Sequence, residues 1–355
     1  MTDFNDTQPE TGSNPFWLIG LVLLAFLGFS AASIALPHDP YIRYQQLGDT
    51  MHAETIGNYE KLHFDNTPID IAIIGNSRLR SGVISDLLSA ELEDDLGAKP
   101  NVINLSMAQE GRNAHFSLAR ELLETHPETK LIILSAIEQM PREGHPSFRT
   151  IANSGDVLRA PLLVNRTYLD DLVFLPFRQM SLFAQTQLPK TFGVRREYSP
   201  APAENATLQS EAESWIPPWE LEWGAFPSRQ TEEQIRAAAI ARVTGINDQL
   251  LPEWAADFEF THERAYTGQI AKMAGETGTR LAFLYLPIFE NPEPLRQLGY
   301  YEDLGPVFSA THLADDAEIF RDYGHFNPDG SMQLTRWLAE QIIERETLPA
   351  AGDGE

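Results

Sequence analysis

Residues 69–82 read IDIAIIGNSRLRSG, a short apolar run that ends at a glycine turn and leads into a helical pattern. The run at 69–74 is typical of a buried strand, because β-branched residues favour strands and the apolar positions follow one another after Asp70. Gly75 permits a tight turn, and apolar residues then recur at helical spacing. The stretch therefore predicts a strand, a turn that carries Ser77, and a helix.

The same unit recurs along the chain. Apolar runs stand at 102–105 (VINL), 131–137 (LIILSAI) and 281–286 (LAFLYL), each beside a segment of helical periodicity. Strands of this kind alternating with amphipathic helices predict a parallel sheet covered by helices on both faces. This is an α/β fold with three layers, α/β/α. We assign this domain to residues 67–346. Residues 37–66 are interpreted as a stalk or linker, or as an amphipathic lead-in helix, and 347–355 as a polar tail.

Residues 141–230 depart from this alternation and are rich in proline, aromatic and polar residues. We interpret them as an insertion between the third strand and a helix whose Thr231 and Gln234 match a capping box. The insertion contains three closely spaced tryptophans, Trp215, Trp219 and Trp223. These side chains either close a small subsidiary core or stack on carbohydrate.

Near the N-terminus, residues 16–36 form an uncharged run of 21 residues, FWLIGLVLLAFLGFSAASIAL. A helix of this length is about 31 Å long, which matches a hydrocarbon core of about 30 Å. The tail before it, residues 1–15, has no Lys or Arg, so the basic start of a signal peptide is missing. The sequence therefore predicts one membrane-spanning helix, with a signal peptide cleaved near Ser33-Ile34-Ala35 as the alternative.

The composition excludes several classes of site. The chain of 355 residues has 26 Lys and Arg against 51 Asp and Glu, a formal net charge of −25, and no Cys. Nucleic acid is not an expected partner, because its binding relies on Lys and Arg that neutralise phosphates. His115 and His126 lack zinc-ligand spacing and the acidic clusters lack EF-hand spacing, so we expect no metal and no cofactor.

Three residues suggest nucleophilic catalysis. Ser77 stands at a strand-to-helix turn, where its hydroxyl can be exposed and free N–H groups can stabilise negative charge, although an ordinary helix N-cap is the alternative. Asp322 and His325 stand three residues apart in RDYGHFNPDG, a spacing that places both side chains on one face of a turn or helix. An imidazole oriented by a carboxylate is the base that a serine nucleophile needs.

These motifs resemble those of the SGNH or GDSL hydrolases, a superfamily of serine esterases and acyltransferases. Gly75-Asn76-Ser77 stands where most members have Gly-Asp-Ser, and Asp322, His325 and Gly330 match the C-terminal block. The resemblance implies a flavodoxin-like fold, with Ser77 as nucleophile, His325 as general base and Asp322 as its partner. It also implies an oxyanion hole formed by the N–H groups of Ser77 and Gly111.

The third block is the departure from the family pattern. Most members follow the third strand with Gly-x-Asn-Asp, whose asparagine donates to the oxyanion, whereas LIILSAIEQM offers Ser135 and Glu138. A carboxylate only accepts hydrogen bonds, so Glu138 cannot take this role. Either Asn113, Arg112 or His145 replaces the donor, or the protein is a poor catalyst.

The arginines near the expected pocket are candidate substrate contacts. Arg78, Arg80 and Arg112 could receive an anionic substrate in a chain that is otherwise acidic, while solvent exposure or pairing with acidic residues is the alternative.

The resemblance also implies a function. Membrane-tethered relatives, among them the alginate O-acetylation and teichoic-acid D-alanylation proteins, modify cell-envelope polymers. We expect an esterase or O-acyltransferase acting on acyl esters or acylated polysaccharide, with its domain outside the cytoplasm (periplasmic) and a membrane-bound O-acyltransferase as partner. The alternative is a non-catalytic scaffold of the same fold, or a glycan-binding partner of such an enzyme. The positive-inside rule, taken literally, places the domain in the cytoplasm instead, because Arg43 is the one basic residue soon after the apolar run.

Overall fold

The computed structural model describes residues 15–138, 142–197, 230–245, 250–291 and 295–348. Its centre is a sheet of five parallel strands in the order β2-β1-β3-β4-β5. The strands are β1 (Ile71–Ile74), β2 (Val102–Asn104), β3 (Leu131–Ser135), β4 (Arg280–Tyr285) and β5 (Val307–Ser309). The α/β class with a parallel sheet is therefore confirmed.

The sequence predicts four of these strands to within two residues at each end. It misses β5, whose three residues are too short to give a periodic signal. The strand order reverses at β1, because the chain moves from β1 outward to β2 and then crosses back to β3. In open α/β sheets such a reversal opens a crevice at the carboxyl ends of the strands.

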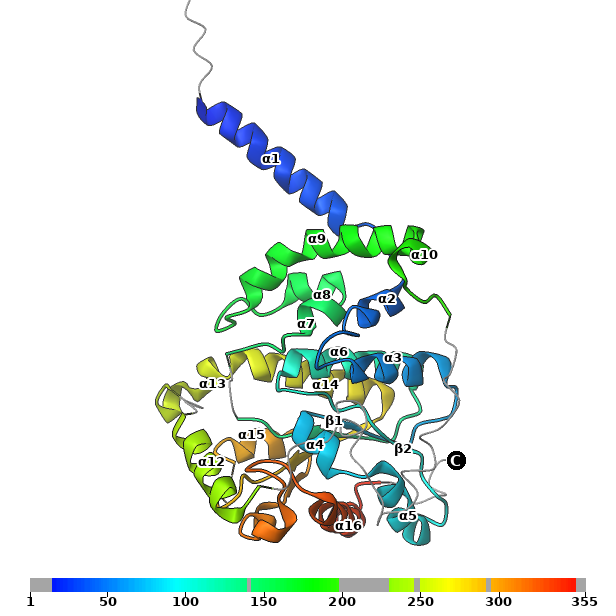
Figure 1. Ribbon diagram of the computed structural model, residues 1–355, viewed down its shortest axis with the longest axis vertical. Coiled ribbons are helices and arrows are strands. Elements are labelled where there is room, and N and C mark those ends of the chain that lie inside the picture. Colours follow the sequence, from blue (N-terminus) through cyan, green and yellow to red (C-terminus); the bar gives the residue numbers. More distant parts are fainter. Residues whose placement is uncertain (1–14, 139–141, 198–229, 246–249, 292–294, 349–355) are drawn as a thin grey trace, which may run out of the picture.

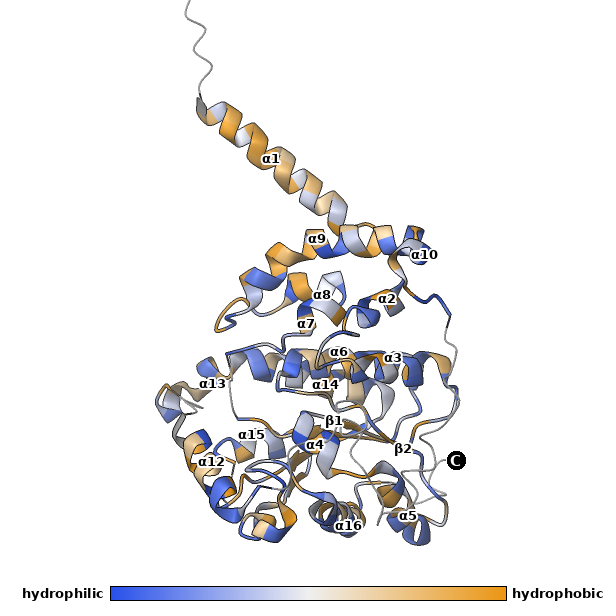
Figure 2. Cartoon of the chain, viewed as in Figure 1, coloured by the Kyte–Doolittle hydropathy of each residue, from blue (hydrophilic) through white to orange (hydrophobic). Residues whose placement is uncertain are grey.

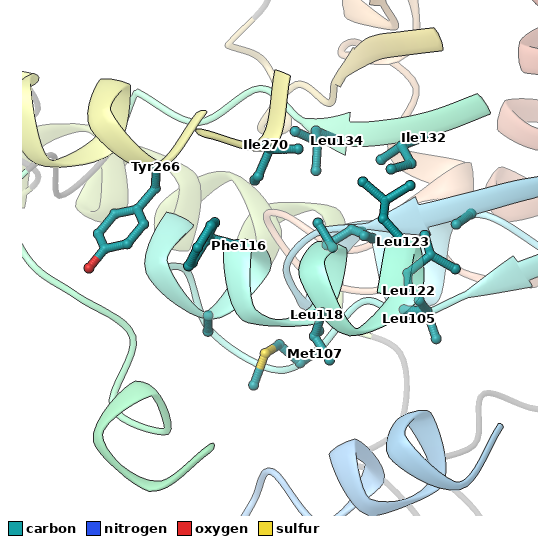
Figure 3. Close-up of a cluster of buried hydrophobic side chains, with 14 of the residues drawn as sticks. Leu105, Met107, Phe116, Leu118, Leu122, Leu123, Ile132, Leu134, Tyr266 and Ile270 are labelled. Carbon is teal, nitrogen blue, oxygen red and sulfur yellow. The ribbon is translucent and has the colours of Figure 1, made fainter. Parts of the chain in front are cut away.

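Two hydrophobic clusters lie on opposite faces of the sheet, because successive side chains of a strand point to opposite sides. Ala72 and Ile74 of β1 belong to one cluster, whereas Ile71 and Ile73 belong to the other. Figure 3 shows part of the first cluster, in which β3 side chains face those of α6. Helices of this side are α3 (Glu54–Phe64), α6 (Arg112–Thr125) and α14 (Thr261–Thr277), and those of the other are α4 (Ser77–Gly82), α5 (Ser85–Leu96) and α16 (Pro328–Glu344) (Figure 1).

Helix α1 (Pro15–Ile34) projects from the body of the protein (Figure 1). Its stretch Phe16–Ile34 is long and apolar enough to cross a membrane, by length and composition. Most of its side chains are exposed. Among the described residues, it is the one helix that meets these criteria.

The segment 37–66 is not a free stalk. Its helices α2 (Pro40–Gln45) and α3 place Tyr41, Tyr44 and Tyr59 in the hydrophobic core, and the rings of Tyr41 and Tyr59 stack 5.4 Å apart. Some polar residues of these short helices are also buried, and Asn58 Nδ2 donates to Leu105 O (2.9 Å), so the segment packs as helices against the body.

Part of the insertion is helical. It contains α7 (Phe148–Ile151), α8 (Ser154–Arg159), α9 (Tyr168–Gln187) and α10 (Pro189–Phe192), whereas the tryptophan cluster lies outside the described residues. The predicted capping box before α12 (Glu232–Gly245) is confirmed, because Thr231 N donates to Gln234 Oε1 (2.9 Å) and Gln234 N donates to Thr231 Oγ1 (3.3 Å). The remaining elements are α13 (Ala256–Glu259), α15 (Leu298–Glu302) and three short 3₁₀ turns at Glu253–Ala255, Thr311–Leu313 and Ala317–Ile319.

Candidate active site

Ser77 is the first residue of α4, directly after the turn that ends β1. The side chain of Asn76 caps this helix, since its Oδ1 accepts hydrogen bonds from Arg78 N (3.0 Å) and Leu79 N (3.4 Å). The alternative in which Ser77 serves as the N-cap is therefore wrong, and its hydroxyl is available for another partner.

That partner is His325, which lies 248 residues further along the chain. Ser77 Oγ and His325 Nε2 are 2.9 Å apart, and His325 Nδ1 lies 2.9 Å from Asp322 Oδ1 and 3.0 Å from Oδ2. When His325 Nδ1 carries its proton toward the carboxylate, Nε2 is free to accept a proton from the serine hydroxyl. The three residues selected from the sequence are thus brought into one hydrogen-bonded relay.

Backbone groups hold the Asp322 carboxylate in place. Its Oδ1 also accepts hydrogen bonds from Gly324 N (3.0 Å) and His325 N (2.9 Å). Burial by itself raises the pKa of Asp322, but the hydrogen bond and charge of His325 and the Gly324 N–H outweigh it and hold the pKa well below its usual range. The group is therefore an anion at neutral pH, as a partner for an imidazolium must be.

Arg78 connects helix α4 to the loop that carries Asp322 and His325, which we call the histidine loop. Its Nε donates to Gly324 O (2.8 Å), and its Nη2 donates to Leu286 O (2.8 Å) after β4 and also contacts Pro287 O. The sequence suggests Arg78 as a substrate contact, but these bonds give it a positioning role. Arg80 likewise pairs with Glu54 of α3.

A cavity of about 660 Å³ opens over this relay. It is lined by residues from the turn after β1, the loop before α6, the histidine loop and α14. Those with a bearing on chemistry are Ser77, Arg80, Gly111, Arg112, Glu263, Asp322 and His325.

Gly111 stands at the start of α6 with a φ of 155°. A Cβ atom added there would lie 2.3 Å from His145 N and 2.4 Å from His145 Cβ, so no larger residue fits without moving the loop. The position predicted for an oxyanion N–H is therefore one that requires glycine.

The three candidates for the missing oxyanion donor differ in their contacts. Asn113 is buried and its Oδ1 accepts hydrogen bonds from His145 N (2.8 Å) and Ala114 N (3.0 Å), which fixes the loop behind the cavity. His145 uses both ring nitrogens, Nε2 with Ala108 O (2.7 Å) and Nδ1 with Ser147 N (3.0 Å). Neither side chain lines the cavity.

Arg112 is the candidate with a spare donor. Its Nε donates to Glu263 Oε1 (2.9 Å) and its Nη2 to Ser135 O (2.6 Å) at the end of β3, and its side chain is fully buried. Its Nη1 has no hydrogen-bond partner within the described residues. Arg112 therefore brings an unused donor to the end of β3, beside the stretch where the third block stands.

Glu138 has a different task. Its carboxylate accepts hydrogen bonds from the backbone N–H groups of Arg296 and Gln297 and so fixes the loop after β4. The partner of Arg112, Glu263, is a residue that sequence reasoning missed. It lies on α14, 151 residues from Arg112, and no local sequence motif marks it. A charged residue on the apolar face of a predicted helix is nevertheless a sign that it has a buried partner of opposite charge.

Two further histidines, His115 and His126, are buried. His126 Nε2 lies 3.2 Å from Leu62 O, and burial lowers the pKa of His115 well below its ordinary value. No group of three His, Asp or Glu side chains suited to a metal ion is found in the described part of the chain.

Neither a scan against protein-family models nor a search of curated proteins finds a match to this chain. The resemblance to SGNH hydrolases therefore rests on the motif residues themselves.

Proposed function

We propose that this protein is a membrane-anchored serine esterase or O-acyltransferase with the three-layer α/β/α arrangement of SGNH hydrolases. The observation that carries the proposal is the Ser77–His325–Asp322 relay, with both hydrogen-bonded contacts at 2.9 Å, in a cavity beside the reversal of strand order. An isolated serine or histidine is common, but an aligned acid, base and nucleophile drawn from distant segments is typical of nucleophilic catalysis.

The reaction follows from the order of the hydrogen bonds. Ser77 Oγ attacks the ester carbonyl carbon while His325 Nε2 takes the hydroxyl proton, and the carbonyl π electrons move to oxygen. The tetrahedral intermediate collapses, the C–O bond to the alcohol breaks, and His325 returns the proton to that alcohol. Water or an acceptor hydroxyl then attacks the acyl-serine by the same steps in reverse. Asp322 stays ionised and stabilises the imidazolium.

The negative charge on the intermediate needs donors. We assign this role to the backbone N–H groups of Ser77 and Gly111 and to Arg112 Nη1. The Arg112 side chain lines the cavity and is held in place by Glu263 and Ser135 O, so its unused Nη1 would act as a preorganised hydrogen-bond donor. Arg112 thereby replaces the asparagine of the third block.

The substrate proposal rests on the resemblance and on the membrane helix. We propose acyl esters of cell-envelope glycans as substrate, a soluble domain outside the cytoplasm, and a membrane-bound O-acyltransferase as partner. The paired states of Arg78 and Arg80 argue against a role for these two residues as free anion receptors.

The test is covalent labelling of the full chain in detergent by a fluorophosphonate probe, together with hydrolysis of p-nitrophenyl acetate. Wild type should be labelled and active, and Ser77→Ala should lose both properties. Ser85→Ala, at a serine that does not line the cavity, is the matched control and should behave as wild type. Equal labelling and activity in wild type and Ser77→Ala would end the proposal.

A second candidate is a non-catalytic scaffold of the same fold, or a glycan-binding partner of a membrane O-acyltransferase. The observation in its favour is that the segment after β3 offers Glu138, an acceptor only, where the family has an amide donor. Failure of wild type to react with the probe, combined with retention of a folded sheet by circular dichroism, would favour this candidate.

A further inference from the structure

Helix α9 turns apolar side chains outward. Leu169, Val173 and Phe177 recur every four residues and therefore share one face of the helix. Their exposed fractions are 65%, 66% and 57%. Leu188 and Phe192 continue the exposed apolar surface beyond the end of the helix, at 55% and 51%. We call these five residues the α9 apolar face.

The opposite face of α9 is buried and mixed in character, with Leu175 and Leu182 beside polar residues. Arg178 Nη1 donates to Arg149 O (2.6 Å) and Ala152 O (2.9 Å), and Gln185 Nε2 donates to Gln46 Oε1 (3.3 Å). Asp171 is also buried. A helix at a water-exposed surface has polar residues on its outer face, whereas α9 also presents apolar side chains outward. The sidedness of α9 suits a helix whose outer surroundings are apolar.

The membrane-crossing candidate α1 ends on this same helix. Gln179 Nε2 donates to Ile34 O (3.2 Å), and Asp39 N, just beyond α1, donates to Thr186 Oγ1 (3.1 Å). If α1 crosses a bilayer, its last turn lies at the boundary between hydrocarbon and water, so α9 is held at that depth. Figure 1 shows α9 across the top of the body, between it and α1, and Figure 2 shows apolar segments along both helices.

The charge of this region differs from that of the whole chain. Residues 142–197 contain eight Lys and Arg against five Asp and Glu, whereas the full chain has 26 against 51. Of these basic residues, Lys190, Arg195 and Arg196 are exposed and stand close to Leu188 and Phe192 in the chain. Exposed basic residues of this kind are attracted to anionic lipid headgroups. The local charge therefore favours a lipid surface over a second copy of this acidic chain.

We propose that α9 lies in the plane of the membrane interface, with the α9 apolar face inserted among the lipids next to the end of α1. An interfacial helix of this kind buries its apolar side about 5–10 Å into the boundary between headgroups and acyl chains. The inference depends on α1 crossing a membrane and is independent of the proposed catalytic function.

Because the chain has no Cys, a single introduced Cys carries a fluorescent label without competing sites. The full chain is reconstituted in phosphatidylcholine–phosphatidylglycerol vesicles with the environment-sensitive label NBD at Val173, Phe177, Leu24 of α1 or Glu340 of α16. Labels at 173, 177 and 24 should be blue-shifted, quenched by nitroxide lipids and shielded from aqueous iodide. The label at 340, on the far side of the body from α1, should show the opposite behaviour (Figure 1).

Three results would overturn the proposal. Labels at 173 and 177 that iodide reaches as readily as the label at 340 would place α9 in water. Labels shielded from iodide but not quenched by nitroxide lipids would mean that a protein surface, such as a second copy, covers the face. A label at 24 that escapes lipid quenching would remove the premise and the proposal with it.

A pair of matched variants tests the face itself. Phe177→Asp and Phe258→Asp alter phenylalanines of similar exposure, 57% and 54%, so neither is expected to unfold the protein. With the label at 173, Phe177→Asp should reduce quenching by nitroxide lipids and Phe258→Asp should leave it unchanged. Equal quenching in both variants would contradict insertion of this face.

Discussion

Replacement of Asp322 by asparagine tests whether the relay works through the tautomer of His325. The asparagine oxygen can still accept from Gly324 N and His325 N, so the turn should persist. Its NH₂ group, however, would then point toward His325 Nδ1 and donate to it. That hydrogen bond places the imidazole proton on Nε2, where it blocks transfer from Ser77.

The expected magnitude follows from this switch. A triad with the wrong histidine tautomer loses about 10⁴ in kcat, which corresponds to about 5.4 kcal/mol of transition-state stabilisation. The geometry here, with both His325 contacts at 2.9 Å, supports a loss of that order. The free energy of unfolding should change much less, because two of the three Oδ1 hydrogen bonds survive.

The assay is p-nitrophenyl acetate hydrolysis, with unfolding by urea measured on the same samples. Asp316→Asn is the matched control, since Asp316 also caps a backbone N–H (Glu318 N, 2.9 Å) but does not contact His325. A loss below about tenfold in Asp322→Asn, in a wild type that is active, would refute the tautomer argument.

Three further outcomes are expected. Arg112→Lys retains a positive charge beside Glu263 but loses the several N–H donors of the guanidinium. It should lower kcat by about 10² to 10³ with little change in KM, as measured by steady-state kinetics. Gly111→Ala should abolish hydrolysis and lower the melting temperature, because its Cβ meets His145 N at 2.3 Å; an active, equally stable variant would contradict this. Because the folded-state pKa of Asp322 is depressed, its contribution to stability is present above the unfolded value of about 3.9 and is lost as the pH falls below it. Urea unfolding between pH 5 and pH 2 should therefore show a smaller loss of stability in Asp322→Asn than in wild type.

The sequence predicts the sheet and the relay for a clear physical reason. Strands β1, β3 and β4 are continuous apolar runs, and Ser77, Asp322 and His325 stand in short motifs with local spacing. Local spacing marks the Asp322–His325 pair, whereas the pairing of Ser77 with His325, 248 residues away, is expected from the family resemblance.

Features that depend on distant partners could not be predicted in this way. Arg78 looks like a substrate contact until Gly324 O and Leu286 O are placed beside it, 246 and 208 residues away. The pairing of Arg112 with Glu263 is equally remote, and β5 is too short to be recognised before its neighbour β4 exists. Helix α9 has apolar residues on both its buried and its outer face, so helical periodicity alone does not show which face packs on the body.

The exposed apolar face of α9 has a practical consequence for preparing this protein. Removal of residues 1–36 deletes the candidate membrane-spanning helix α1 but leaves Leu169, Val173 and Phe177 at the surface, and it also takes away Ile34 O as the acceptor for Gln179. An apolar face left without its lipid surroundings is an aggregation liability. Detergent is expected to be needed for the truncated chain as much as for the full-length chain.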